Sequence, residues 1–151
     1  MNGKKILRIS LFFLIALTLA FIWSRSMKSV EESRSESAAV MQFLKPFLKL
    51  IFPKRPITNH LVRKLAHFFE YALLGVEIAA CYFLWKERKR FWVYPLIMGF
   101  TVASIDETIQ LFVGRGNQFS DVMLDLFGFA CGMGGLCLLI WIVKKGKREN
   151  G

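Results

Sequence analysis

The sequence is poor in cysteine and lacks the short motifs of well-known enzyme classes. It has three cysteines and no CxxC pair, which excludes a disulfide-stapled miniprotein and gives no sign of a cysteine-based zinc or redox site. All three lie in apolar runs, where a free cysteine is typically a packing residue. No GxSxG, HExxH or Walker motif occurs, so a serine hydrolase, a zinc protease and a nucleotide-driven pump have no support.

Acidic residues are also scarce. The chain of 151 residues has 11 Asp and Glu against 21 Lys and Arg, a net charge of +10. Its 54% hydrophobic content, with 15 Phe and 4 Trp, excludes disorder for most of the chain. The same apolar excess indicates a membrane protein. The basic residues flank apolar runs and form no basic soluble domain, so they predict bilayer anchors and no binding of nucleic acid.

Four long apolar runs define the expected architecture. They cover residues 6–23, 65–85, 91–113 and 122–143. A helix needs about 20 residues to cross the hydrocarbon core, so the runs predict an all-α integral membrane bundle of four transmembrane helices. The first run has one alternative, a cleaved signal peptide with Thr18-Leu19-Ala20 as a possible cleavage site. Because the apolar stretch continues to Trp23, we expect a retained helix.

The distribution of Lys and Arg predicts the orientation. Basic clusters precede the first run and follow the second and the fourth: Lys4, Lys5 and Arg8; Lys86, Arg88, Lys89 and Arg90; Lys144, Lys145, Lys147 and Arg148. By the positive-inside rule these segments, and both termini, face the cytoplasm. The external side then receives 24–64 and 114–120. The nine Lys and Arg of 24–64 weaken this prediction without reversing it.

The external segment 24–64 has two parts. Residues 24–40 are polar and serine-rich, and they predict a loop or a short helix. Residues 41–55 mix Phe, Leu and Ile with Lys and Arg, which is typical of a short interfacial helix with its apolar side in lipid. Pro46 fits the start of that helix or a kink in it. The alternative is a hydrophobic flap packed on the bundle.

Polar residues within the runs are the strongest pointer to function, because ionisable groups inside a membrane are costly. They are His67, Glu70, Glu77, Asp106, Glu107, Gln110, Asp121 and Asp125. Helix rise places most of them at one depth, in the outer third of the membrane. We therefore expect one outward-facing polar pocket built from three helices.

Glycines on the last run predict a close helix contact. Gly128, Gly132 and Gly135 share the face of Asp125, and small residues spaced in this way let a neighbouring helix approach. Phe129 lies on a different face, where we expect a leucine to be tolerated.

The pocket has two chemical interpretations. The candidate catalytic residues are His67, Glu70, Asp106, Glu107 and Asp125, and the candidate substrate-binding residues are Lys64, Gln110, Arg115 and Asp121. Such a set can hold a divalent cation such as magnesium, calcium or manganese, or supply a general acid and base. Arginine at the mouth suits a phosphate or carboxylate group. The alternative is a buried ionic network that only fixes helix packing.

Three stretches resemble the VanZ-like family of small bacterial membrane proteins: VRKLAHFFEYALLG, DETIQLFVGRG and SDVMLDLFGFACG. The matching residues are Lys64, His67, Glu70, Tyr71, Gly75, Asp106, Glu107, Gln110, Arg115, Asp121, Asp125, Gly128 and Gly132. This chain has Ile109 where many relatives have histidine, and its turn before Gly114 is one residue shorter. No second histidine is therefore expected in the pocket.

The resemblance implies a single membrane domain over 1–151 and a role at the cell envelope. It implies a changed response to glycopeptide or lipid-like antibiotics such as teicoplanin, by an unknown mechanism. The alternative is a membrane-embedded enzyme that acts on a lipid or cell-wall precursor through the acidic pocket in the outer leaflet. The oligomeric state and any cofactor stay open at this point.

Overall fold

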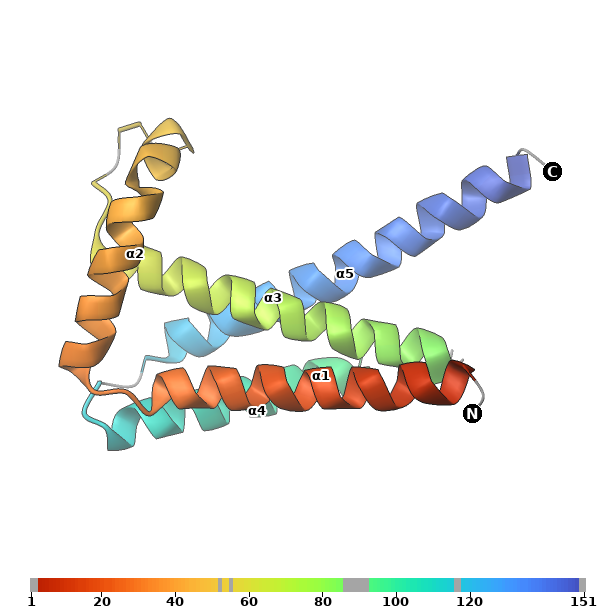
Figure 1. Ribbon diagram of the computed structural model, residues 1–151, viewed down its shortest axis with the longest axis horizontal. Helices are drawn as coiled ribbons and strands as arrows, with labels where there is room; N and C mark the ends of the chain where they lie inside the picture. The colour runs from red at the N-terminus through yellow and green to blue at the C-terminus, as the bar shows by residue number, and fades with distance from the viewer. Residues whose placement is uncertain (1–2, 52, 55, 86–92, 116–117, 150–151) are drawn as a thin grey trace.

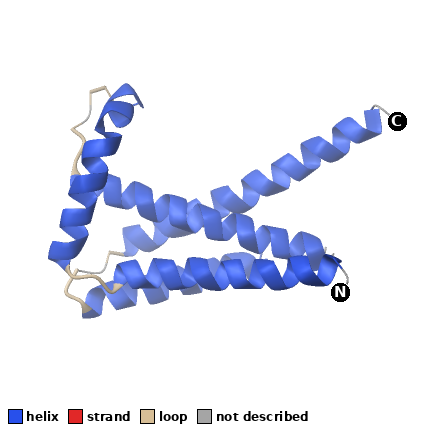
Figure 2. Ribbon diagram, in the orientation of Figure 1, coloured by secondary structure: helices blue, strands red, loops and turns tan. Residues whose placement is uncertain are grey.

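The structure is a computed structural model that describes residues 3–51, 53–54, 56–85, 93–115 and 118–149. These residues form five α-helices (Figures 1 and 2). The helices are α1 (Gly3–Ser26), α2 (Val30–Ile51), α3 (Asn59–Trp85), α4 (Val93–Phe112) and α5 (Phe119–Glu149). The prediction of an all-α protein is therefore confirmed.

Three of the helices are long and apolar enough to cross a membrane. They are α1, α3 over Asn59–Leu84 and α5 over Phe119–Arg148. The expected fourth span coincides with α4, but Asp106, Glu107 and Gln110 within its 20 residues dilute its apolar character. The predicted count of four is thus not confirmed. The expected basic turn Lys86–Arg90 and the first two residues of the run 91–113 lie outside the described residues.

The external segment is more helical than expected. A single helix of 22 residues, α2, joins the two parts that the sequence separated, and Pro46 lies inside it. The helix begins at a capping box, in which the Glu32 amide donates to Ser29 Oγ (3.3 Å) and the Ser29 amide donates to the Glu32 carboxylate (2.9 Å). The prediction of a short interfacial helix starting near residue 41 was wrong in length.

The helices share one common end. Figure 1 shows α2 lying across the end of the bundle where α1 and α4 finish and α3 and α5 begin. Both chain termini lie at the opposite end (Figure 1). The second half of α5 diverges from the other helices (Figure 1). A helix in this position suits the surface of a bilayer, while the bundle axis suits its interior.

Glycines bring α3 and α5 into backbone contact. A Cβ atom on Gly132 would lie 1.8 Å from the carbonyl oxygen of Ala72, and one on Gly75 would lie 2.1 Å from that of Phe129. Gly128 is equally restricted, 2.4 Å from the Phe68 carbonyl oxygen. The close contact predicted at Gly128 and Gly132 is confirmed. At Gly135 it was wrong, because the residue is exposed and nothing lies within 4 Å of a Cβ there.

Phe129 joins α5 to α4 and belongs to the core. It is fully buried, and its ring occupies the space beside Gly99, whose added Cβ would meet the ring at 2.8 Å. This burial argues against the expectation that the position tolerates leucine, which stays an untested prediction. The backbone of Phe129 lies at the α3 contact beside Gly75, while its side chain points toward Gly99 on α4.

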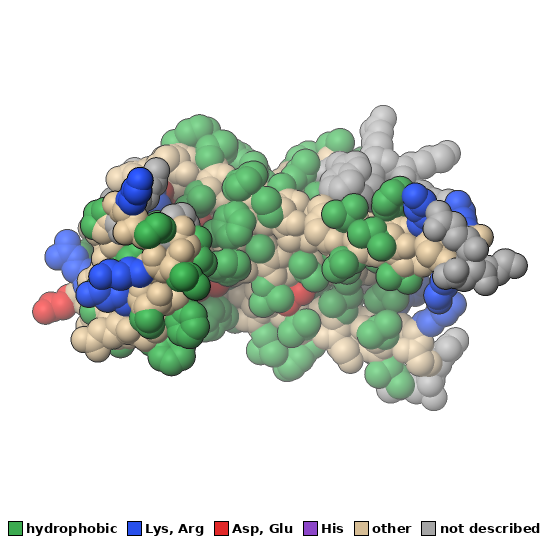
Figure 3. All heavy atoms as spheres, turned by 90° about the horizontal axis from the view of Figure 1, so that it is seen from above, with side chains coloured by type: hydrophobic (Ala, Val, Ile, Leu, Met, Phe, Trp, Pro, Cys, Tyr) green, Lys and Arg blue, Asp and Glu red, His purple; other side chains and the backbone are tan. Residues whose placement is uncertain are grey.

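The outer surface of the bundle is apolar. Figure 3 shows hydrophobic side chains over the middle of the molecule and Lys and Arg toward its two ends. Phe12, Phe13 and Trp141 are among the large exposed side chains, which fits contact with lipid.

Of the cysteines, Cys81 is buried as expected, but Cys131 is exposed, so the packing role predicted for Cys131 was wrong.

Candidate functional site

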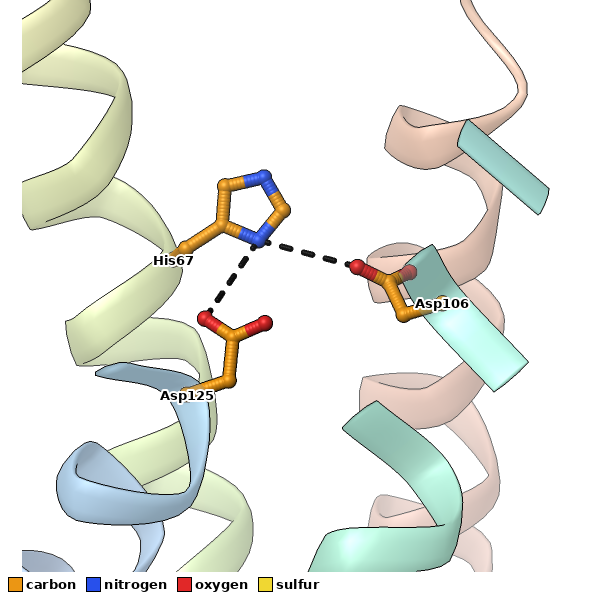
Figure 4. Close-up of side chains that lie close together, drawn as sticks. All are labelled: His67, Asp106 and Asp125. Atoms are coloured by element: carbon orange, nitrogen blue, oxygen red, sulfur yellow. Dashed lines mark ion pairs between the residues drawn. The ribbon is translucent and has the colours of Figure 1, made fainter. Parts of the chain in front are cut away.

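Three helices bring His67, Asp106 and Asp125 together (Figure 4). Nδ1 of His67 lies 3.7 Å from Oδ2 of Asp106 and 3.8 Å from Oδ1 of Asp125. His67 is eight residues into α3, while Asp106 and Asp125 are six residues from the same end of α4 and α5. At about 1.5 Å per residue, all three lie about 9–12 Å from the end of the bundle that carries α2.

The cluster is buried but its polar atoms are incompletely satisfied. Asp106 is 0% and Asp125 is 1% exposed. Gln110 Nε2 donates to Oδ2 of Asp106 (3.1 Å), whereas Nδ1 of His67 and Oδ2 of Asp125 have no hydrogen-bond partner within the described part of the chain. Buried polar atoms are normally paired, so atoms without a protein partner indicate that something else binds there.

A small cavity adjoins the cluster. Its lining residues are Arg63, Lys64, His67, Glu107, Gln110, Asp121, Leu124 and Asp125. The space open to the centre of a water-sized sphere is about 10 Å³, which is room for about one water molecule or ion. The structure thus places Lys64, Glu107, Gln110 and Asp121 at this cavity, beside the three clustered side chains. A lipid headgroup does not fit inside it.

Two of the cavity's acidic side chains have protein partners. Lys64 Nζ lies 2.6 Å from Oδ1 of Asp121, and the backbone amide of Gln118 donates to Oε2 of Glu107 (3.3 Å). The first contact ties α3 to α5, and the second ties α4 to the turn before α5. Both contacts fix the positions of acidic side chains that line the cavity.

Glu70 and Arg115 both contact Arg25, at the end of α1. Arg25 Nε lies 3.3 Å from Oε1 of Glu70, and Nη1 of Arg115 donates to the Arg25 carbonyl oxygen (3.0 Å). Glu70 lines a different, mostly apolar groove between α1 and α3, of about 240 Å³, with Leu17, Thr18, Phe21 and Leu73. The direct catalytic role predicted for Glu70 and the substrate-binding role predicted for Arg115 stay predictions.

Arg25 is a residue that the sequence reasoning missed. Its Nη1 lies 3.5 Å from Oε2 of Glu36, and Lys28 also bonds Glu36. The hydrogen bond from Lys28 lowers the pKa of the Glu36 carboxyl. Through these contacts Arg25 joins α1 to α2 and to α3. The only signal in the sequence is an arginine shortly after an apolar run. This pattern is equally typical of a membrane anchor, so it does not predict a role at the site.

Tyr71 is the second missed residue. It is fully buried one turn beyond His67 on α3, within electrostatic range of Asp106 and Asp125, and its hydroxyl has no hydrogen-bond partner among the described residues. The resemblance included Tyr71 but assigned it no role. A tyrosine four residues after a polar histidine shares its helix face, which is the signal that was available.

A basic pocket between α2 and α3 completes the site. Its lining residues are Ser33, Arg34, Ser37, Asn59, His60 and Arg63, and its volume is about 160 Å³. Arg63 lines both this pocket and the small cavity beside His67. The sequence reasoning missed the pocket because it forms only when residues 30–40 are helical, with Ser33 and Ser37 one turn apart.

Glu77 belongs to a separate interaction. Thr18 Oγ1 donates to Oε1 of Glu77 (2.8 Å), and Glu77 is 2% exposed. It lies ten residues from His67 on α3, about 15 Å along the helix. Glu77 therefore links α1 to α3 deep in the bundle, away from the cluster.

The fold and the site define a helical membrane protein with a buried polar cluster near one end of its bundle. A family model described as VanZ/LLP1 matches residues 11–142. The chain therefore belongs to the VanZ/LLP1 family, as the sequence resemblance predicted. No curated protein and no solved structure matches it.

Proposed function

We propose that the chain is a membrane-embedded enzyme that acts on the polar head of an envelope lipid or cell-wall precursor. The observation that carries the proposal is the buried His67–Asp106–Asp125 cluster, in which polar atoms lack protein partners. A network that served packing alone would satisfy its buried groups, because each unpaired one destabilises the fold. Glu107, at the adjoining cavity, supplies a general base or acid.

The neighbouring pockets support an amphiphilic substrate that carries phosphate. Arg34 and Arg63 line the pocket between α2 and α3, beside Ser33, and arginine binds phosphate with paired hydrogen bonds. The apolar groove between α1 and α3 has room for part of an acyl chain. Because Arg63 also lines the cavity beside His67, a headgroup bound by Arg63 lies at the edge of that cavity.

A changed response to glycopeptides follows from this activity and does not require the protein to bind them. Antibiotics such as teicoplanin act at the outer face of the membrane, where the proposed substrate is exposed. An altered lipid or precursor pool there changes how such amphiphiles insert.

The proposed topology places the site at the outer surface of a bacterial plasma membrane. It has four crossings, with α4 as the third in chain order, and both termini in the cytoplasm. The support comes from basic residues near both termini and from the common position of the termini opposite α2 (Figure 1). One side of α4 packs against the other helices. The polar residues Asp106 and Glu107 lie on that buried side, so α4 can cross the membrane without exposing them to lipid.

Cysteine labelling checks this topology. In a background without Cys81, Cys131 and Cys137, we expect Ser120→Cys to react with an impermeant thiol reagent on intact cells, because Ser120 is exposed at the α2 end. Lys147→Cys, at the other end of α5, should react only after the membrane is permeabilised. The opposite pattern would move the site to the inner leaflet.

A lipid and precursor profile tests the activity. We expect cells that lack the protein and cells with Asp125→Asn to accumulate the same membrane species, and wild-type protein to remove it. Asparagine keeps the shape of Asp125 but removes its charge. The abundance of each protein in the membrane is the control. A wild-type profile with Asp125→Asn at normal abundance would mean that the protein acts without catalysis.

A further inference from the structure

We infer that His67, Asp106 and Asp125 hold one divalent transition-metal ion, of the class of Zn²⁺ or Mn²⁺. Each residue offers one ligand atom, and the three atoms lie within 4.8 Å of one another. They come from three different helices, α3, α4 and α5 (Figure 4). Metal binding is measured on the purified protein, so it can be tested independently of the proposed activity.

The spacing of the ligand atoms suits a shared ion better than direct bonds between the side chains. The distances of 3.7 and 3.8 Å from Nδ1 of His67 to the two carboxylate oxygens are too long for hydrogen bonds. Metal bonds of about 2.0–2.2 Å in tetrahedral geometry separate two ligand atoms by about 3.4 Å. Contraction of the two contacts to His67 by about 0.3–0.4 Å, and approach of the two carboxylate oxygens from within 4.8 Å of each other, would complete the site. Rotation of the three side chains can supply both movements.

Further buried polar atoms near the cluster have no hydrogen-bond partner in the described part of the chain. Oδ2 of Asp125 and the Tyr71 hydroxyl are buried and have no hydrogen-bond partner among the residues that the structure describes. The small cavity lined by His67 and Asp125 has room for about one water molecule beside the ion. These atoms are a second indication of a ligand, independent of the grouping of three side chains.

The charge balance also favours a cation. Glu70 has Arg25 as its partner and Asp121 has Lys64. Asp106 and Asp125 have no Lys or Arg within 4 Å in the described ranges, and the basic atom near both is Nδ1 of His67. Two carboxylates side by side in a buried setting repel one another and lose hydration. A divalent ion neutralises both charges.

The ligand types select the metal. One imidazole nitrogen with two carboxylate oxygens suits zinc or manganese, whereas magnesium and calcium prefer oxygen ligands alone. Three protein ligands plus water is the arrangement of catalytic zinc sites. Gln110 Nε2 bonds Oδ2 of Asp106 and so orients that carboxylate, as groups behind metal ligands commonly do.

Metal analysis of the full chain tests the inference. The protein is purified in detergent without a polyhistidine tag, stripped with a chelator, and titrated separately with Zn²⁺, Mn²⁺ and Mg²⁺. We expect about one equivalent of Zn²⁺ or Mn²⁺ bound per chain and a raised Tm, with at least a 100-fold weaker response to Mg²⁺. His67→Gln and Asp125→Asn should each lower the metal affinity by at least 100-fold.

Glu77→Gln is the matched control, because Glu77 is also a buried carboxylate on α3 but lies away from the cluster. It should bind metal as wild type does. If His67→Gln or Asp125→Asn fails to fold, titration of the wild-type protein still decides the matter. No bound Zn²⁺ or Mn²⁺ in folded wild-type protein would overturn the inference and leave a proton shared between the two aspartates. Equal binding by all three folded variants would show that the metal binds elsewhere.

Discussion

Replacement of Gly132 by leucine should prevent stable folding. The Cβ atom alone would lie 1.8 Å from the Ala72 carbonyl oxygen and 2.9 Å from the Ala72 Cα. These are backbone atoms of α3, so no side-chain rotation relieves the overlap and the two helices must separate. Overpacking in a core costs about 1–3 kcal/mol, and more where backbones meet. We expect little protein in the membrane, and a Tm in detergent lower by at least about 10 °C for what remains.

Gly134→Leu is the control for this prediction. Gly134 is two residues further along α5, and nothing lies within 4 Å of a Cβ at that position. The same change in size should leave the Tm and the abundance close to those of wild type, because a leucine there only adds apolar surface. Similar stability of the Gly132 and Gly134 variants would mean that α3 and α5 do not cross at Gly132.

The sequence predicted the helices better than their ends. The apolar runs identified α1, α3, α4 and α5, because a membrane requires long stretches without charge. The first two turns of α3, from Asn59 to Lys64, were missed. Four of these six residues are polar or basic. The start of the helix depends on Thr58 Oγ1, which accepts a hydrogen bond from the Leu61 amide (3.2 Å). In α2, the composition of residues 24–40 left a loop or a short helix open, although the sequence contains the capping box at Ser29.

Much of the candidate site could also be predicted. Helix periodicity and rise were sufficient to bring His67, Asp106 and Asp125 to one level, because each helix begins or ends at the same surface. The partners of these residues were not predictable. Arg25 meets Glu70 only because α1 packs beside α3, and the pocket lined by Arg34 and Arg63 needs α2 to lie against α3. Contacts of this kind depend on how whole helices pack, which one sequence does not specify.

If the site is catalytic as proposed, we expect Glu107→Gln to abolish activity without loss of protein. A glutamine oxygen can still accept the hydrogen bond from the Gln118 amide, so the contact between α4 and the following turn is kept. Only the charge and the ability to take up a proton at the cavity are lost. Removal of a general acid or base lowers activity by about 10²–10⁴-fold. Growth or lipid complementation, measured together with membrane abundance, gives the result.

Glu77→Gln separates this effect from the general cost of changing a buried glutamate. Glu77 and Glu107 are both 2% exposed, and each accepts one hydrogen bond from the protein, Glu77 from Thr18 and Glu107 from Gln118. Glutamine preserves both bonds, but only Glu107 lines the cavity beside His67. Glu77→Gln should therefore keep wild-type activity. If Glu107→Gln is also fully active at normal abundance, the acidic residues at the cavity serve packing, because removing one charge from a crowded cluster would then only relieve repulsion.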